Sequence, residues 1–533
     1  MKLASISFLG LAAGLTVAAA GCIDLPGSGG TDDDLTSVGG DEYVIDYDGY
    51  VDVAPGASDD VVKGVIHRQL KSALGALREQ GIGVADRDAV RNLANPTLTR
   101  TRVTVVAPGG AVRGELDRVR YHYHDQALVE KGHGTTSPLS LTLLYGDYIA
   151  NAGSLIPICS DDQTTAADSL WYHYQPNLSA CKAAIVAEQR AIDHDREALS
   201  AATQIPASDA DRKFLTTRAT LVKATAAPDK WPEHDQLWGF AGDTSRTKLV
   251  VYSFFGVDSD INNPSDSGLV EYMRFERELR KRLPKLAVTE TSPNAWLLDF
   301  YVDGQKLPNV TWDTVEKWIV DGTGFPASVA NDQAKKAALL RQVITNFSDR
   351  WIVWSAPMTI IQNGATRTMT LEIRTWHGFE DGSPDIRQRA RWRYLEAFWH
   401  ADVFAYTGHS HFGHGPLEPW EYSAANFPDR YQVMLFNSCL SFNYYDEDFL
   451  RMHPGGSQKL DVVVNGLPAY WMGMGGATAA YIAGITSGTQ SWRQLLTGMR
   501  VNLPWQSSYD PMRAVNGELD NQFTPSAGAI SVQ

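Results

Sequence analysis

Residues 401–443 constrain the fold most, because two short apolar runs in this stretch each end abruptly in reactive side chains. The runs cover residues 403–406 and 431–436, and nearly every position in them is apolar. Such runs are typical of parallel strands that are buried on both faces. Open α/β sheets place their sites at the carboxyl ends of neighbouring parallel strands. The stretch therefore predicts a mainly parallel sheet with reactive groups at one edge.

Each apolar run leads into a side chain that can take part in covalent chemistry. His409 follows the first run after Thr407 and Gly408, and Cys439 follows the second run after Asn437 and Ser438. A thiol is a good nucleophile only as the thiolate, and a neighbouring imidazole can lower its pKa or accept its proton. If the two strands are neighbours, we expect this nucleophile and this base to meet at the sheet edge.

The two motifs, Tyr406-Thr407-Gly408-His409-Ser410 and Asn437-Ser438-Cys439, resemble those of the caspase–gingipain superfamily of cysteine peptidases. The resemblance is closest to the gingipain branch and covers roughly residues 248–499. It implies a three-layer α/β fold and hydrolysis of a peptide or protein substrate, with no cofactor required. The Gly-rich residues 473–485 are similar in kind to the next strand of that family.

Carried over residue by residue, the resemblance makes Cys439 the nucleophile and His409 the catalytic histidine. The backbone N–H groups of Cys439 and Ser410 would form the oxyanion hole, a device that commonly contributes about 100-fold or more in rate. Ser410 stands where the family has Gly, so a side chain is added beside that hole. Three further residues are candidates to line the substrate cleft: Asp258, His411 and Asn437.

Two other interpretations of these motifs stay open. A Cys at the end of an apolar strand can be a small core residue, and His409 can be a turn residue. The domain would then be a catalytically inactive relative that binds a peptide or a cell-envelope partner. The spacing of His409, His411 and His414 is close to a zinc-hydrolase motif, but Gly413 replaces its Asp. The sequence therefore predicts no metal for the reaction.

The N-terminus resembles a bacterial lipoprotein signal. Lys2 precedes an apolar stretch, residues 3–20, and small residues lead directly to Cys22. By this resemblance residues 1–21 are a signal peptide, and Cys22 is lipid-modified and anchors the chain to a membrane of the bacterial cell envelope. Ile23, rather than Asp, follows the cysteine, which indicates the outer membrane. Residues 22–40 are rich in Gly, Ser and Asp, which predicts a flexible tether.

The cysteine count leaves one thiol over. Four cysteines are present, and outside the cytoplasm thiols tend to pair. Cys159 and Cys181 lie 22 positions apart in one segment, which predicts a local disulfide. With Cys22 acylated, Cys439 is the remaining thiol, kept either as an inert core residue or for its reactivity.

A chain of 533 residues is expected to form two or three domains. Residues 41–230 predict a mixed α+β domain of unknown role, and residues 240–533, where strands alternate with helices, predict the caspase/gingipain-like domain. The boundary is expected within residues 206–233, which are rich in proline. In the first domain the patterns predict helices over 61–80 and 178–202 and strands over 101–106, 116–123 and 139–145. A formal charge of −15 argues against a nucleic-acid partner.

Two segments carry patterns that suggest metal binding outside this site. His122 and His124 alternate along a strand and would share one face, where Asp125 and His133 could complete a metal site. The alternative is an ordinary surface or core pair of histidines. Residues 258–269 begin like a calcium-binding loop but lack its Gly and its final Glu. A structural calcium ion there stays open beside a solvated loop.

Overall fold

The computed structural model describes residues 35–84, 98–132, 136–225, 228–291, 296–378, 384–410, 417, 419–445, 447–525 and 530–531. All of these residues belong to one compact unit of the chain. The predicted signal peptide and Cys22 lie outside the described residues. No helix within the described ranges is both long and apolar enough to cross a membrane.

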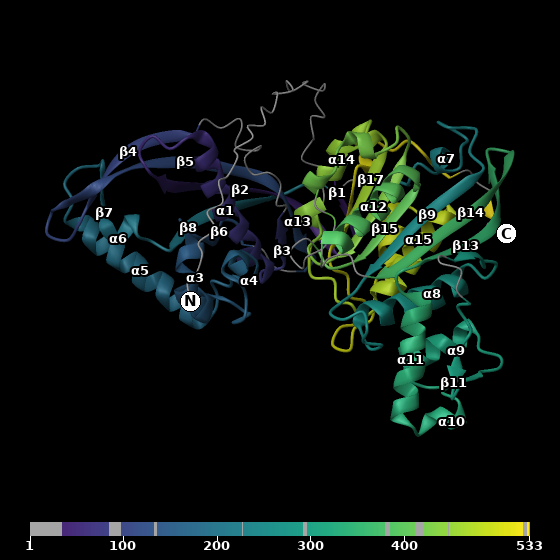
Figure 1. Cartoon of the computed structure of the whole chain (residues 1–533). Helices are drawn as coiled ribbons and strands as arrows, with labels where there is room; N and C mark the ends of the chain where they lie inside the picture. The colour runs from purple at the N-terminus through teal and green to yellow at the C-terminus, as the bar shows by residue number, and fades with distance from the viewer. Residues whose placement is uncertain are drawn as a thin grey trace, which may run out of the picture. The chain divides into compact units, whose positions relative to one another are not determined.

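The N-terminal half is built on a sheet that is antiparallel except at β7, which pairs parallel to β4, and one face of it lies against helix α1 (Asp59–Arg78) (Figure 1). The strand order is β6-β8-β2-β5-β4-β7, with β3 beside β5. Ile66, Leu70 and Leu77 are buried along α1, so the predicted amphipathic helix is confirmed. The strands are β2 (Gly40–Val53), β3 (Ile82–Val84), β4 (Thr99–Val106), β5 (Val112–Glu130), β6 (Leu139–Leu144), β7 (Gln204–Pro206) and β8 (Phe214–Lys223).

A disulfide joins two helices beside this sheet. Cys159 at the end of α3 (Tyr148–Cys159) is bonded to Cys181 near the start of α5 (Ser179–Glu197), with an S–S distance of 2.02 Å. The predicted pairing is therefore confirmed. Two shorter helices also lie among the described residues of this half: α4 (Leu170–His173) and α6 (Ala207–Ala210).

One strand of the first sheet lies within the region where the domain boundary is expected. β8 falls inside residues 206–233 and pairs with β2 and β6, so the first sheet ends at Lys223. Pro228 and Pro232 follow this strand. Leu35–Ser37, which fall in the predicted tether, form β1 and pair with β18 in the second sheet. These three residues therefore belong to the sheet and not to a flexible tether.

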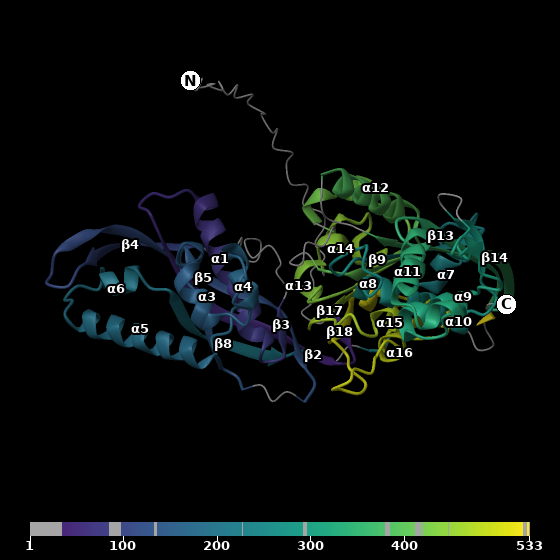
Figure 2. The same ribbon diagram turned by 60° about the horizontal axis from the view of Figure 1, so that its bottom comes forward.

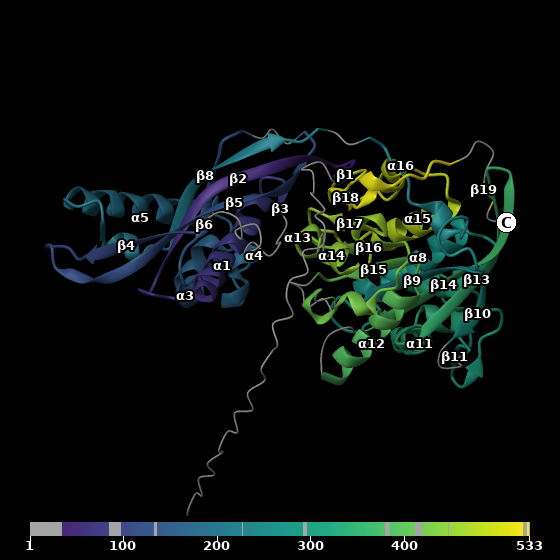
Figure 3. The same cartoon turned by 90° about the horizontal axis from the view of Figure 1, so that it is seen from above.

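The second sheet is mixed, with a parallel centre and antiparallel edges. Its order is β1-β18-β17-β16-β15-β9-β14-β13-β10, with β19 beside β13 (Figure 3). β17, β16, β15, β9 and β14 run parallel to one another, and the outer strands are antiparallel to their neighbours. The central strands are β9 (Lys248–Gly256), β14 (Ala365–Gly378), β15 (Val403–Gly408), β16 (Gln432–Ser438) and β17 (Leu460–Asn465). The outer strands are β18 (Arg513–Asn516), β13 (Trp351–Gln362), β10 (Ala287–Thr291) and β19 (Ile530–Ser531), and β11 (Tyr301–Val302) pairs with β12 (Gln305–Lys306) separately.

Helices cover both faces of this sheet, so the chain has the α/β character that the sequence predicts (Figure 2). Phe254, Phe404 and Phe436 point to one face, where they pack with α12 (Pro384–His400), α13 (Phe442–Tyr445) and α14 (Asp448–Met452). Alternate residues such as Val403 and Leu435 point to the other face. That face is covered by α8 (Ser267–Arg282), α11 (Gln333–Phe347), α15 (Met474–Ser487) and α16 (Trp492–Gly498); the remaining helices are α7 (His234–Leu237), α9 (Trp312–Glu316) and α10 (Ala327–Ala330).

Residues 473–485 form most of α15, so their expected similarity to a strand is wrong. The glycines serve close packing of helices rather than a strand. A Cβ atom on Gly475 would lie 2.0 Å from the carbonyl oxygen of Glu271 in α8, whereas a Cβ on Gly476 would meet open space. The α8–α15 contact therefore requires glycine at position 475 and not at position 476.

We expect Gly475→Ala to lower the free energy of unfolding, because α15 must move away from α8 to admit the new methyl group. Gly476→Ala is the matched control in the same helical turn. It should raise the free energy of unfolding by about 0.5 kcal/mol, since alanine favours the helix. Urea unfolding followed by circular dichroism measures both. Equal effects of the two substitutions would contradict the packing described for Gly475.

Candidate functional site

Three neighbouring strands bring the predicted reactive residues to the same edge of the sheet. β15 lies between β9 and β16, and all three run parallel. Gly408, the last residue of β15, pairs with Ser438, the last residue of β16. His409 and Cys439 are therefore the residues that directly follow these two strands. Asp258 follows the end of β9 on the other side of β15. The expectation that the two apolar runs are neighbouring parallel strands is confirmed.

The local structure explains why Tyr406 and Gly408 precede His409. The Tyr406 hydroxyl donates a hydrogen bond to the carbonyl oxygen of His409 at 2.7 Å. To reach it, the hydroxyl passes over Gly408, where a Cβ atom would lie only 2.5 Å from the hydroxyl oxygen. Gly408 therefore leaves room for the hydrogen bond that fixes the backbone of His409.

The His409 ring has a defined tautomer. Its Nε2 lies 2.9 Å from the carbonyl oxygen of Asp258 and 3.6 Å from the Oδ1 of the same residue. A carbonyl oxygen can only accept, so Nε2 carries the hydrogen, and Nδ1 is the basic nitrogen when the ring is neutral. The edge of the ring meets Trp471, and the side chain is 39% exposed. His409 is thus oriented by a third group and open to solvent.

A buried carboxylate fixes the loop that supplies this carbonyl. Asp266 accepts hydrogen bonds from the backbone N–H groups of Asp258, Ser259 and Asp260 at 3.0, 2.8 and 3.0 Å. Burial alone would raise the pKa of Asp266, but these N–H donors outweigh it and lower that pKa. Asp266 also caps α8 through Gly268. Asp266 lies within the loop that was considered for calcium binding, and its carboxylate is already engaged by these N–H donors.

Cys439 lies in a sharp turn between β16 and α13. The next residue, Leu440, has a φ of +51°. This value lies in the left-handed region, which residues with bulky side chains rarely adopt. Its N–H donates to the carbonyl of Leu467 at 3.2 Å, which holds the turn. Strained backbone of this kind often occurs at functional sites. The strain places the thiol at the sheet edge instead of letting the strand continue.

The surroundings of the Cys439 thiol favour its neutral form. Cys439 keeps some exposure to solvent, but burial of its sulfur raises the thiol pKa; a backbone hydrogen bond with Ala469 and the charge of Arg78 oppose this shift only in part. Sγ donates to the carbonyl oxygen of Ala469 at 3.3 Å. Among the described residues no hydrogen bond joins Sγ to the His409 ring, so the two groups share an edge without forming an ion pair.

The other predicted site residues differ in burial and in whether the structure describes them. Ser410 is buried directly after His409. Asn437 is fully buried, and its amide nitrogen donates to Thr478 at 3.1 Å, so its predicted place in a substrate cleft is wrong. It is a core polar residue because β16 is covered on both faces. His411 and His414 lie outside the described residues.

Sequence reasoning missed Asp266, Trp471 and Ala469. An Asp followed by Ser-Gly at the start of an amphipathic pattern is a helix N-cap signal, and it could have identified Asp266. Trp471 and the Ala469 carbonyl leave no such signal in a single sequence.

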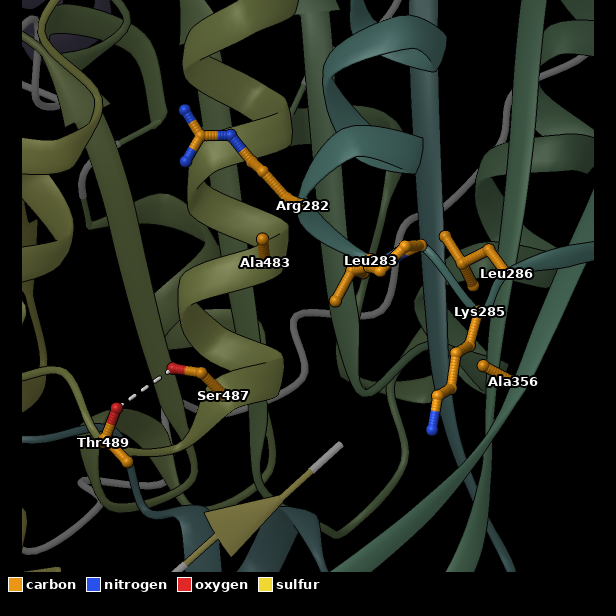
Figure 4. Close-up of a pocket in the computed structure, with 9 residues that line it drawn as sticks. Arg282, Leu283, Lys285, Leu286, Ala356, Ala483, Ser487 and Thr489 are labelled. Carbon is orange, nitrogen blue, oxygen red and sulfur yellow. Dashed lines mark hydrogen bonds between the residues drawn. The ribbon is translucent and has the colours of Figure 1, made fainter. Parts of the chain in front are cut away.

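A cavity of about 260 Å³ lies away from this edge (Figure 4). Arg282 and Leu283 line it at the end of α8, and Ser487 lines it at the end of α15. Because α8 starts beside the carboxyl end of β9, its last residues reach the opposite end of the sheet. Neither His409 nor Cys439 lines this cavity.

No protein-family model, no curated protein sequence and no solved structure matches this chain. Its functional assignment therefore rests on its own residues and their geometry.

The raised thiol pKa predicts how alkylation of Cys439 depends on pH. Because only the thiolate reacts, the rate with iodoacetamide should rise with pH through a midpoint above the ordinary value of 9.0. Mass spectrometry of the Cys439 peptide measures the rate, with the Cys439→Ser variant as background. A rate that is already constant below pH 7 would instead indicate a thiolate–imidazolium pair in the resting protein.

Proposed function

We propose that this chain is a cysteine endopeptidase that hydrolyses peptide bonds through Cys439 and His409. The observation that carries the proposal is the hydrogen bond from His409 Nε2 to the Asp258 carbonyl, at the carboxyl end of three adjacent parallel strands. It assigns the ring hydrogen to Nε2 and leaves Nδ1 able to act as a general base. A nucleophile, a base and an orienting group then follow three strands that are neighbours in the sheet.

The proposed reaction uses these groups in turn. Nδ1 of His409 accepts the thiol proton, and Sγ of Cys439 attacks the carbonyl carbon of the peptide bond. The backbone N–H groups of Cys439 and Ser410 stabilise the oxyanion of the tetrahedral intermediate. The imidazolium then protonates the leaving amine, and water hydrolyses the thioester. The three-layer domain with a parallel sheet centre is compatible with the caspase–gingipain resemblance.

In the proposed cycle the described structure corresponds to a resting state. The thiol must leave the carbonyl of Ala469 and turn toward His409 before it can react. Catalytic hydrogen bonds are often long or misaligned before substrate binds. A peptide in the site would supply the interactions that favour this rotation.

The neutral, hydrogen-bonded thiol also favours a second candidate function. A Cys439 that stays bonded to Ala469 would make this domain an inactive relative that binds a peptide or an envelope partner. The two functions differ in turnover, because only the peptidase consumes its peptide.

We expect Cys439→Ser and His409→Ala each to lower kcat/KM for peptide hydrolysis by about 10³-fold or more, because each removes a partner in covalent catalysis. Cys439→Ser should also abolish labelling by a peptidyl acyloxymethyl ketone. His400→Ala, at an exposed position at the end of α12, is the control and should leave the rate unchanged. A fluorogenic peptide library supplies the assay.

The outcomes of this experiment separate the candidate functions. Hydrolysis that persists in Cys439→Ser would exclude this cysteine as the nucleophile. An unmutated protein that binds library peptides without cleaving them or reacting with the ketone would favour the binding module.

The substitution Asp258→Asn tests which atom of Asp258 orients His409. We expect less than about a fivefold loss in kcat/KM, because the backbone carbonyl remains and a partly exposed carboxylate contributes little. If the carboxylate were the orienting group, the loss would approach the 10³-fold or larger effects of removing a buried triad carboxylate. Steady-state kinetics on the best library peptide decides between the two.

A further inference from the structure

A cluster of two histidines and two aspartates stands on the outward face of the N-terminal sheet. β2 and β5 are antiparallel neighbours, and their register sets Asp46 opposite His124 and Asp48 opposite His122. The intervening residues of both strands, among them Tyr47 and Tyr123, are buried on the other face. The four side chains of the cluster therefore project together from two paired strands.

The ligand atoms of this cluster are close enough to share one ion. Asp46 Oδ1 lies 2.7 Å from His124 Nδ1 and 3.2 Å from His122 Nε2. One nitrogen or oxygen from each of Asp46, His122 and His124 lies within 4.8 Å of the other two. Ligands of a tetrahedral zinc ion at about 2.0–2.2 Å are roughly 3.3 Å apart, so small side-chain rotations are sufficient.

Each ring nitrogen of His122 faces a carboxylate oxygen, an arrangement that favours a bound cation. Its Nδ1 lies 3.0 Å from Asp48 Oδ1, while its Nε2 faces Asp46. A neutral imidazole has only one N–H group, so one of these two nitrogens would direct a lone pair at a carboxylate. Either a second proton or a metal ion removes this repulsion. With a metal on Nε2, the N–H on Nδ1 donates to Asp48.

We propose that Asp46, His122 and His124 bind a divalent transition-metal ion of the zinc type, with Asp48 orienting His122. A metal-bound histidine almost always donates its other N–H to such a partner. Two imidazoles and one carboxylate suit zinc better than calcium or magnesium. The side chains of His122 and His124 are 47% and 50% exposed, so water can complete the coordination.

This site differs from the metal site considered for the sequence, although it uses the same two histidines. Asp125 lies on the buried face, where it accepts a hydrogen bond from Tyr123 at 2.9 Å. His133 lies outside the described residues. The third ligand, Asp46, and the orienting Asp48 come from β2, far away in the sequence, which is why a local motif could not identify them.

Metal titration of the full chain tests the proposal. After chelator treatment and its removal, Co²⁺ should give a visible ligand-field band that saturates at one ion per chain, and Zn²⁺ should displace it. His122→Ala and His124→Ala should each weaken binding by at least about 10- to 100-fold, and Asp48→Ala by about tenfold. His173→Ala is the matched control, because His173 pairs with Asp161 at 2.7 Å in the same half and should have no effect.

Two binding results would overturn the metal site. One is the absence of saturable Co²⁺ or Zn²⁺ binding at millimolar ion; the other is binding that both histidine variants retain. Nitrogen-15 spectra of the histidine rings add a readout independent of affinity. Zn²⁺ should remove the proton from Nε2 of His122, whereas a ring that stays doubly protonated would leave only an ion pair with the aspartates. None of these measurements depends on Cys439, so they test the metal site independently of the proposed peptidase activity.

Discussion

The in-register pairing of β9, β15 and β16 is the constraint on which the candidate site depends. A shift of one residue in β16 would turn Cys439 to the opposite face and replace it by a neighbour. Both faces of these strands are buried, so burial alone does not fix the register. Phe404 and Phe436 pack under α12–α14, while Ala405 and Leu435 face the layer of α8 and α15. A shifted strand would exchange these side chains between two close-packed layers.

The site itself depends more on backbone atoms than on side chains. The Asp258 carbonyl sets the tautomer of His409, the Ala469 carbonyl holds the thiol, and Asp266 fixes the first of these through three N–H groups. A charge of the N-terminal half also affects the pKa of the thiol. Arg78 of α1 acts on the pKa of Cys439, and its guanidinium is held by a 3.0 Å hydrogen bond to the Tyr172 carbonyl. The chemical environment of the thiol is thus shared between both halves of the chain.

Sequence patterns predicted the elements whose signal is local. The period of α1, the apolar runs of β15 and β16 and the proximity of Cys159 to Cys181 all appear within short windows, and the structure has each of them. The missed features depend on partners distant in sequence. Gly475 resembles a strand or turn glycine until α8 is placed against it, and Asn437 resembles a cleft residue until Thr478 covers it. Backbone acceptors such as Ala469 have no residue-type signature at all.

His409 and His122 show how the number of acceptors around an imidazole decides what it can do. The Nε2 of His409 meets a carbonyl, so one N–H satisfies it and Nδ1 is left to act as a base. His122 meets a carboxylate at each nitrogen and has one N–H for two acceptors, so it needs a cation, either a proton or a metal ion. A ring with one fixed acceptor suits proton transfer, because its other nitrogen can gain and lose a proton in turn. A ring between two carboxylates suits ion binding, because the charge around it is balanced only when a cation is present.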